Sequence, residues 1–233
     1  MIALFERHLG RLPSPMIDLA CGNGGHLLRF SQRGISARGN DISSAMLIQA
    51  KDKLGRAGYG EVPLTNFPMQ TIPSEKIGGP SFELATAFYT ALGYLWEPSD
   101  LNLLVRNLKR ILNPGGFLFA DLWNGHKMAE HFSPHRVITR ESETHYLVRE
   151  SNVIAAREHN ALKVEFIFRV TNKLNNTKHE FIENHMLRYH TVAEWKSILL
   201  GSGFELVESG PFFDAATVTH EASNFFIFAK LVE

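Results

Sequence analysis

The sequence predicts an α/β protein with a doubly wound, mostly parallel sheet that ends in a late antiparallel strand. Short apolar runs alternate with longer amphipathic segments between residues 16 and 121, and a glycine-rich turn follows the first run. After residue 132 the rhythm changes to long stretches in which apolar residues occupy near-alternate positions. Strands that alternate with helices build parallel sheets, whereas consecutive alternating strands build antiparallel ones. An inserted antiparallel β meander is therefore predicted in the second half.

The apolar runs of the first half are predicted strands, at residues 16–19, 35–40, 83–88 and 117–120. The segments between them carry apolar side chains at spacings of three and four, which predicts helices over residues 26–33, 44–54 and 98–112. Ser43 and Ser99 are the expected N-caps of the second and third helices. Residues 113–116, Asn-Pro-Gly-Gly, should end the third helix and turn into the next strand.

The predicted meander strands cover residues 144–155, 161–170 and 179–189. Thr191 is the expected cap of a helix over residues 192–200, and two strands at 204–209 and 224–231 close the chain. This pattern divides the sequence into an α/β core, formed by residues 1–131 and 190–233, and an inserted subdomain. The insertion, residues 132–189, is expected to form the substrate side of a binding site.

Composition excludes several classes of protein. The 233 residues contain 24 Lys and Arg against 24 Asp and Glu, so bulk charge gives no support for a nucleic-acid or anionic-membrane surface. Cys21 is the only cysteine, which excludes an internal disulfide and a multi-cysteine zinc site and suits a reducing compartment. No apolar run reaches the roughly 18 residues of a membrane span. We expect a cytoplasmic protein and leave homo-oligomerisation open.

The most informative segment runs from Asp18 through a glycine-rich turn to His26. Glycines let a ligand approach the backbone, because no Cβ stands in the way. A dinucleotide site is one alternative, since Ala20, Gly22 and Gly25 fit the G-x-G-x-x-G spacing with the first glycine replaced. Asp18 argues against it, because a carboxylate at the strand end would repel a pyrophosphate and would favour a cationic ligand.

Asp41 follows the second predicted strand, 23 residues after Asp18 (41 − 18). An acidic side chain at this position can accept hydrogen bonds from both hydroxyls of a ribose. It can also cap the helix that begins near Ser44. The two roles can coexist.

Three motifs in order resemble the class I S-adenosylmethionine-dependent methyltransferases, a Rossmann-like family with one late antiparallel strand. They are Ile17–Gly25 (IDLACGNGG), Gly39–Leu47 (GNDISSAML) and Leu112–Gly116 (LNPGG). Within that family, the segment Phe88–Leu95 (FYTALGYL) and the β-rich insertion resemble small-molecule N-methyltransferases that act on antibiotic amino sugars. The resemblance implies S-adenosylmethionine as the cofactor and a small-molecule acceptor as the partner.

The resemblance also implies which residues contact the cofactor. The methionine moiety and ribose would be met by Asp18, Ala20, Cys21, Gly22, Gly24 and Asp41. The adenine would be met by Ile42, Met46, Asn66 and Phe67, where Asn66 replaces the acidic residue that relatives often carry, and the sulfonium end by Phe88 and Tyr89.

Acceptor and catalytic residues are expected near the carboxyl ends of the fourth and fifth strands, where doubly wound folds bind ligands. Trp123 and Tyr189 are the predicted substrate contacts. Tyr94, His190 and His126 are the candidate catalytic residues, in that order, and would orient an amine or accept its proton. Most of the histidines follow residue 125, but their spacing does not support a metal site, and none is predicted.

These expectations define a methyltransferase that acts on a small molecule, with an amine nitrogen as the expected acceptor. Three alternatives stay open at this point. The acceptor could be an oxygen, the turn could serve an NAD-binding oxidoreductase, or the chain could be a non-catalytic module that keeps the fold.

Overall fold

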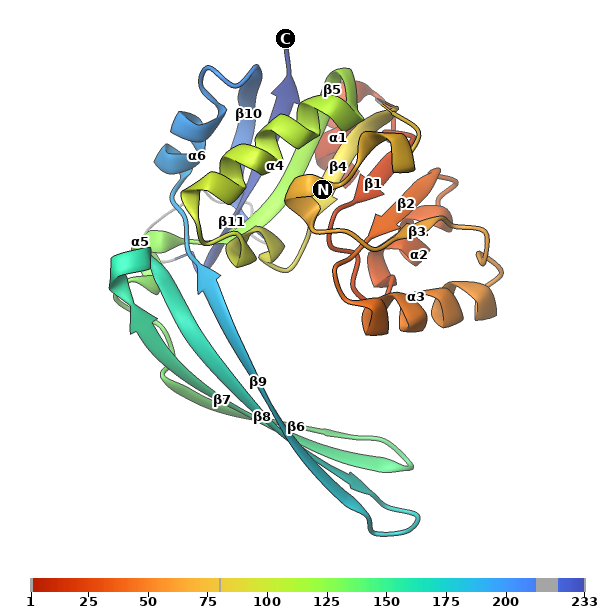
Figure 1. The fold of residues 1–233 in the computed structure, drawn as a ribbon, viewed down its shortest axis with the longest axis vertical. Helices are drawn as coiled ribbons and strands as arrows, with labels where there is room; N and C mark the ends of the chain where they lie inside the picture. The colour runs from red at the N-terminus through yellow and green to blue at the C-terminus, as the bar shows by residue number, and fades with distance from the viewer. Residues whose placement is uncertain (1, 80, 213–221, 233) are drawn as a thin grey trace.

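The computed structural model describes residues 2–79, 81–212 and 222–232, and these residues form two sheets (Figure 1). The larger sheet has seven strands in the order β10-β11-β5-β4-β1-β2-β3. Strands β1 to β5 are parallel, whereas β11 pairs antiparallel with both β5 and β10. The smaller sheet is antiparallel, with the order β6-β7-β8-β9. The predicted fold class is confirmed.

The strands of the larger sheet are β1 (Met16–Asp18), β2 (Ala37–Asn40), β3 (Leu64–Thr65), β4 (Phe82–Ala87), β5 (Leu112–Trp123), β10 (Phe204–Pro211) and β11 (Asn224–Leu231). The helices are α1 (Ile2–Leu9), α2 (Gly25–Ser31), α3 (Ser44–Arg56), α4 (Pro98–Ile111), α5 (Gly125–Met128) and α6 (Val192–Leu199). Short 3-10 turns are η1 (Met69–Thr71), η2 (Ser74–Lys76), η3 (Ala91–Tyr94) and η4 (Arg157–His159). No helix of the described residues is long and apolar enough to cross a membrane.

Two apolar layers cover the larger sheet. On one face, α4 and α6 bury Leu104, Leu108 and Trp195 against the strands. On the other face α1, α2 and α3 form the second layer, and Phe5 of α1 contacts the ring of Phe228 edge-on at 5.6 Å. Burying aromatic and aliphatic side chains on both faces is what a mostly parallel sheet requires.

The smaller sheet extends away from the larger one as a curved arm (Figure 1). Its strands are β6 (His135–Glu141), β7 (His145–Ala156), β8 (Ala161–Asn172) and β9 (Lys178–Arg188). Near its attachment, Leu162, Val164 and Leu187 pack with Trp123 from the end of β5. The arm is therefore anchored at the carboxyl edge of the larger sheet.

Three local predictions need correction. The meander has a fourth strand, β6, whose residues are mostly exposed and polar and so lack an apolar alternation. Ser99 does not cap α4, because Pro98 occupies the first helical position and Glu97 is the N-cap. Residues 113–116 lie within β5, where they form an irregularity in its pairing with β4. Ser43 and Thr191 do cap their helices, as predicted.

Asn40 is fully buried at the end of β2, and its side chain connects this strand to the ends of β1 and β3. Its amide nitrogen donates to the carbonyl oxygens of Leu19 (3.0 Å) and Phe67 (2.9 Å). Its amide oxygen accepts from the Phe67 N–H (3.2 Å) and the Thr65 hydroxyl (3.1 Å). All of its hydrogen-bonding capacity is therefore used on the loops that form the edge of the sheet.

Asn40→Ala should lower the free energy of unfolding by about 2–4 kcal/mol, because several buried polar groups lose their partner at once. Chemical denaturation measures this change. Asn102→Ala, at an exposed position on α4, is the matched control and should change stability by less than about 0.5 kcal/mol. Equal stabilities for the two variants would contradict the role given to Asn40.

Candidate cofactor-binding and active site

The turn after β1 combines an open glycine with a packed one. Gly22 and Gly24 both have positive φ, 52° and 75°, which favours glycine. A Cβ on Gly24 would lie 3.1 Å from Cβ of Ala50, so this glycine lets α3 pack against the turn. A Cβ on Gly22 would meet nothing within 4 Å, so this part of the turn faces open space. The Gly22 side can therefore accommodate a ligand.

Asp41 fastens the turn to the loop after β2. Its carboxylate accepts hydrogen bonds from the Gly22 N–H at 2.7 Å and the Ser43 N–H at 2.8 Å. Asn66 holds the same loop from the other side, donating to the carbonyl oxygens of Asp41 (2.7 Å) and Ile42 (2.9 Å). The Asn66 amide nitrogen is thus committed to the backbone, and its oxygen is the atom left to accept a hydrogen bond.

Asp18 is a buried carboxylate at the end of β1. Both of its oxygens are buried and have no partner with hydrogen-bond geometry. Its pKa is raised to about 7, chiefly by burial; the Ala20 N–H and the Thr86 hydroxyl lower it, and the negative charges of Asp41 and Asp121 raise it by smaller amounts. An unpartnered buried carboxylate is stabilised when a cation or a hydrogen-bond donor binds beside it.

The turn after β4 has an unusual backbone. Tyr89 and Thr90 both adopt positive φ, 57° and 55°, although neither is glycine. Asp121, 2% exposed on the neighbouring strand β5, accepts from the Tyr89 N–H at 2.7 Å and the Thr90 N–H at 3.0 Å. Burial raises the pKa of Asp121 to about 6. Two charge-assisted hydrogen bonds therefore hold this turn.

Aromatic rings line the space beside this turn. The His26 ring contacts the rings of both Phe88 and Tyr89, at centroid distances of 4.1 and 5.3 Å. Tyr89 is 81% exposed and Ile42 is 71% exposed, so large apolar surfaces remain open around the loops after β2 and β4. Such surfaces can cover the faces of a bound ring system.

The remaining predicted cofactor contacts belong to the same loops. Cys21 is buried, and burial raises the pKa of its thiol, which keeps it neutral. Ala20 and Phe67 are half-buried and pack on the core. Met46 is exposed on the first turn of α3. The structure thus brings the predicted cofactor residues together around the carboxyl ends of β1, β2 and β4.

Tyr94, the first candidate catalytic residue, ends η3 and meets the arm. Its hydroxyl lies 2.9 Å from Nδ1 of His185 on β9. Burial and the nearby charges of Glu183 and Asp41 raise the pKa of the Tyr94 phenol. Tyr94 ends the short helical turn that follows the Tyr89–Thr90 turn. His185 could not be predicted from the sequence, because only the contact of the arm with η3 brings it here.

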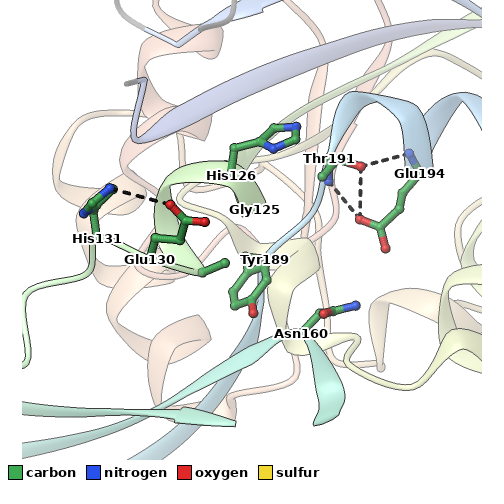
Figure 2. A pocket seen from close by; sticks show the side chains of 9 residues that line it. Gly125, His126, Glu130, His131, Asn160, Tyr189, Thr191 and Glu194 are labelled. Atoms are coloured by element: carbon green, nitrogen blue, oxygen red, sulfur yellow. Dashed lines mark hydrogen bonds and ion pairs between the residues drawn. The ribbon is translucent and has the colours of Figure 1, made fainter. Parts of the chain in front are cut away.

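A cavity of about 730 Å³ lies beside α5 and receives two other predicted residues, His126 and Tyr189 (Figure 2). Figure 2 shows the Tyr189 ring between α5 and Asn160, with Glu194 on the far side of Thr191. None of the predicted cofactor residues lines this cavity. The structure therefore places His126 in this cavity, apart from the predicted cofactor residues.

His190 occupies a different environment from the one predicted for a catalytic base. Its side chain is fully buried, and neither ring nitrogen has a hydrogen-bond partner among the described residues. Burial lowers its pKa to about 4, so it is neutral at physiological pH. Its ring packs against Trp195 at a centroid distance of 5.8 Å. We therefore do not assign proton transfer to His190. Trp123 is half-buried where the arm attaches.

Comparisons with known proteins agree with this geometry. Residues 16–116 match the family model of a methyltransferase domain. These residues of the chain therefore form a methyltransferase domain. Over 201 residues the chain is 26% identical to dTDP-3-amino-3,4,6-trideoxy-α-D-glucopyranose N,N-dimethyltransferase of Streptomyces venezuelae, covering 85% of this chain and 79% of that one. The chain is also 24% identical to dTDP-3-amino-3,6-dideoxy-α-D-glucopyranose N,N-dimethyltransferase of Streptomyces fradiae. That match covers 91% of this chain and 78% of the relative.

Solved structures share the fold of this methyltransferase. An S-adenosylmethionine-dependent methyltransferase from Clostridium acetobutylicum superposes with a TM-score of 0.83 at 16% identity, covering 100% of this chain and 89% of that one. An S-adenosylmethionine-bound amino pentose methyltransferase from Micromonospora echinaspora superposes with a TM-score of 0.74 at 20% identity, covering 99% and 88%. The NAD-binding alternative finds no support in these matches.

S-adenosylmethionine fits the residues present at this site. Asp18 offers an unpartnered carboxylate to the positively charged part of the cofactor, and the open side of Gly22 leaves room beside the backbone. The exposed side chains of Ile42 and Met46 offer apolar surface to an adenine. When bound, the cofactor supplies an activated methyl group on a sulfonium that is a good leaving group.

Lowering the pH through 7 should weaken cofactor binding, because a cation favours the ionised form of Asp18 and protonation removes that charge. Below the pKa the affinity should fall by up to about tenfold per pH unit, and above it the affinity should level off. Calorimetric titrations with S-adenosylmethionine at several pH values measure this. The isosteric Asp18→Asn control should abolish the dependence, and an identical pH profile in both proteins would remove Asp18 from the cation site.

Asp121→Ala should weaken cofactor binding or turnover by about tenfold or more, because the Tyr89–Thr90 turn loses both of its charge-assisted hydrogen bonds. Adding Thr90→Gly to this variant should recover part of the loss, since glycine adopts positive φ without strain. Thr90→Gly alone is the control. Failure of the added glycine to recover any function, measured by calorimetry and single-turnover assays, would show that Asp121 does not act through this turn.

Proposed function

We propose that this methyltransferase methylates the amine nitrogen of a nucleotide-linked amino sugar. The observation that carries the proposal is the similarity to two dTDP-amino-sugar N,N-dimethyltransferases. Because the match to the Streptomyces fradiae protein covers 91% of this chain, it includes most of the inserted arm as well as the cofactor domain. The similarity therefore extends to the part of the chain that is expected to face the acceptor.

The reaction needs alignment more than chemical activation. The amine lone pair forms the new N–C bond as the S–C bond breaks, the bonding electrons leave with sulfur, and the nitrogen loses a proton. Holding two reactants in line contributes about 7–11 kcal/mol in well-oriented systems. In this chain the Tyr89–Thr90 turn, held by Asp121, gives the cofactor end of the site a fixed shape.

The acceptor side is formed by residues 132–189 together with the carboxyl end of β5. Trp123 packs against the base of the arm, and Tyr189 lines the adjoining cavity with His126. A cavity of about 730 Å³ is within the usual range for small-molecule sites. We assign substrate contacts to Trp123 and Tyr189, and an accessory polar contact to His126.

A direct assay tests the proposal. Purified protein is incubated with methyl-labelled S-adenosylmethionine and dTDP-3-amino-3,4,6-trideoxy-α-D-glucopyranose, the sugar named for the Streptomyces venezuelae relative. Mass spectrometry should detect methyl groups on the sugar nitrogen. The matched sugar with a hydroxyl in place of the amine is the control and should stay unmodified. Cofactor binding without transfer to amino sugars, or methylation of the hydroxyl control, would contradict the proposal.

Tyr94→Phe should lower kcat by about tenfold or more while leaving cofactor affinity unchanged, because it removes one hydroxyl and keeps the ring. Loss of a transition-state contact of about 1.4 kcal/mol gives that factor. Kinetics at saturating cofactor measure kcat, and calorimetry measures affinity. If Tyr94→Phe turns over at the parental rate while Tyr94→Ala unfolds, the residue serves packing alone.

A further inference from the structure

Tyr94 belongs to a chain of three side chains that starts on the cofactor domain and ends on the arm. The Tyr94 hydroxyl lies 2.9 Å from Nδ1 of His185, and Nε2 of His185 lies 3.4 Å from Oε2 of Glu183. The two aromatic rings also contact each other edge-on at 5.8 Å. Glu183 and His185 are two residues apart on β9, so both side chains point to the same face of the arm.

The backbone around this chain is held in place. A Cβ on Gly93 would lie 2.9 Å from the carbonyl oxygen of Arg188, so only a glycine lets η3 lie this close to the end of β9. The Arg188 guanidinium donates to the carbonyl oxygen of Trp96 at 3.3 Å, just beyond η3, and pairs with Glu194 at 3.0 Å. Tyr94 and His185 are thus presented to each other by fixed elements.

The geometry points to His185 as a positioning residue that accepts the amine proton through Tyr94, with Glu183 orienting the imidazole. This inference rests on the proposed function. A carboxylate beside Nε2 favours the tautomer that carries its proton there, which leaves Nδ1 free to accept from the phenol. The acceptor nitrogen would pass its proton to Tyr94 Oη, and the phenol proton would move to Nδ1. His185 then carries the extra proton and donates it to solvent.

Electrostatics favour the imidazole over the phenol as the final proton carrier. Burial, Glu183 and Asp41 raise the pKa of Tyr94, so a tyrosinate is disfavoured. Glu183 on β9 and Asp41 after β2 are the charged groups that act on Tyr94, and Arg149 on β7 is separated from His185 by the Phe166 ring. Arg149 lies over the Phe166 ring at 4.9 Å, and His185 contacts the same ring at 5.2 Å. Glu183 is the carboxylate in direct contact with the His185 ring.

Three variants test the relay with the amino-sugar assay described above. His185→Gln should lower kcat by about tenfold or more, with the KM for both substrates within about twofold of the parent. Adding it to Tyr94→Phe should cause little further loss, because the two residues act as one unit. His179→Gln, an exposed histidine on the same strand, is the matched control and should keep the parental kcat. Additive losses, or a parental kcat for His185→Gln, would overturn the relay.

Chemical rescue separates proton transfer from structural support. Imidazole added to His185→Gly should restore a large part of kcat, in proportion to its unprotonated fraction as the pH rises. A structural role would give no rescue and a parental pH profile, which would overturn the proposal.

A measurement without turnover distinguishes failure of the relay from failure of the proposed function. Nitrogen-15 NMR of the full-length protein should show His185 protonated at Nε2 and unprotonated at Nδ1, with an Nδ1 shift that changes in Tyr94→Phe. The His185→Gln spectrum assigns the signal. The Tyr94–His185 pairing is overturned if Nδ1 carries the proton, or if the Nδ1 chemical shift is the same in Tyr94→Phe as in the parent. Either result holds even if methyl transfer is observed. A parent protein with the expected tautomer but no transfer to the amino sugar contradicts the proposed function instead.

Discussion

The left-handed turn at Tyr89 and Thr90 is the constraint on which the geometry of the site depends. It is held by the buried carboxylate of Asp121, which accepts from both backbone amides and offsets the strain of two positive φ angles. The turn leads directly into η3, whose last residue, Tyr94, meets His185 on the arm. One carboxylate on β5 thus fixes both the edge of the cofactor site and the contact between the core and the arm.

Three carboxylates lie near the ends of the parallel strands and give this part of the molecule a negative charge. Asp41 and Asp121 each raise the pKa of Asp18, which shows that their fields overlap there. Asp41 and Asp121 accept hydrogen bonds from backbone amides, whereas neither oxygen of Asp18 has a partner with hydrogen-bond geometry. A pyrophosphate would add negative charge to this cluster, while a sulfonium or an ammonium would relieve it. The electrostatics therefore agree with a methyl donor and disfavour a dinucleotide.

Much of the core could be predicted from the sequence, because its elements depend on residues that are close together in the chain. Contacts between residues far apart in the chain could not be predicted. The strand and helix pattern, the glycine turn and the caps at Ser43 and Thr191 depend on neighbouring residues. The pair of Asp121 and Tyr89 spans 32 residues, and that of Tyr94 and His185 spans 91. Both require the strand order and the register of the arm. Helix α1 was missed for the same reason, because Phe5 is buried by partners as distant as Phe228.

The acidic site creates a problem that the arm is placed to solve. Carboxylates that attract a sulfonium also stabilise a protonated amine, and an ammonium has no lone pair for methyl transfer. Tyr94, the core residue beside the arm, is disfavoured as a tyrosinate because its phenol has a raised pKa, so it needs a neighbour that takes its proton. An imidazole on β9 gives the proton a destination outside the core. The arm is attached to the core by a small apolar cluster. The Tyr94–His185 hydrogen bond adds a polar contact to that attachment, and the proton relay gives this contact a function.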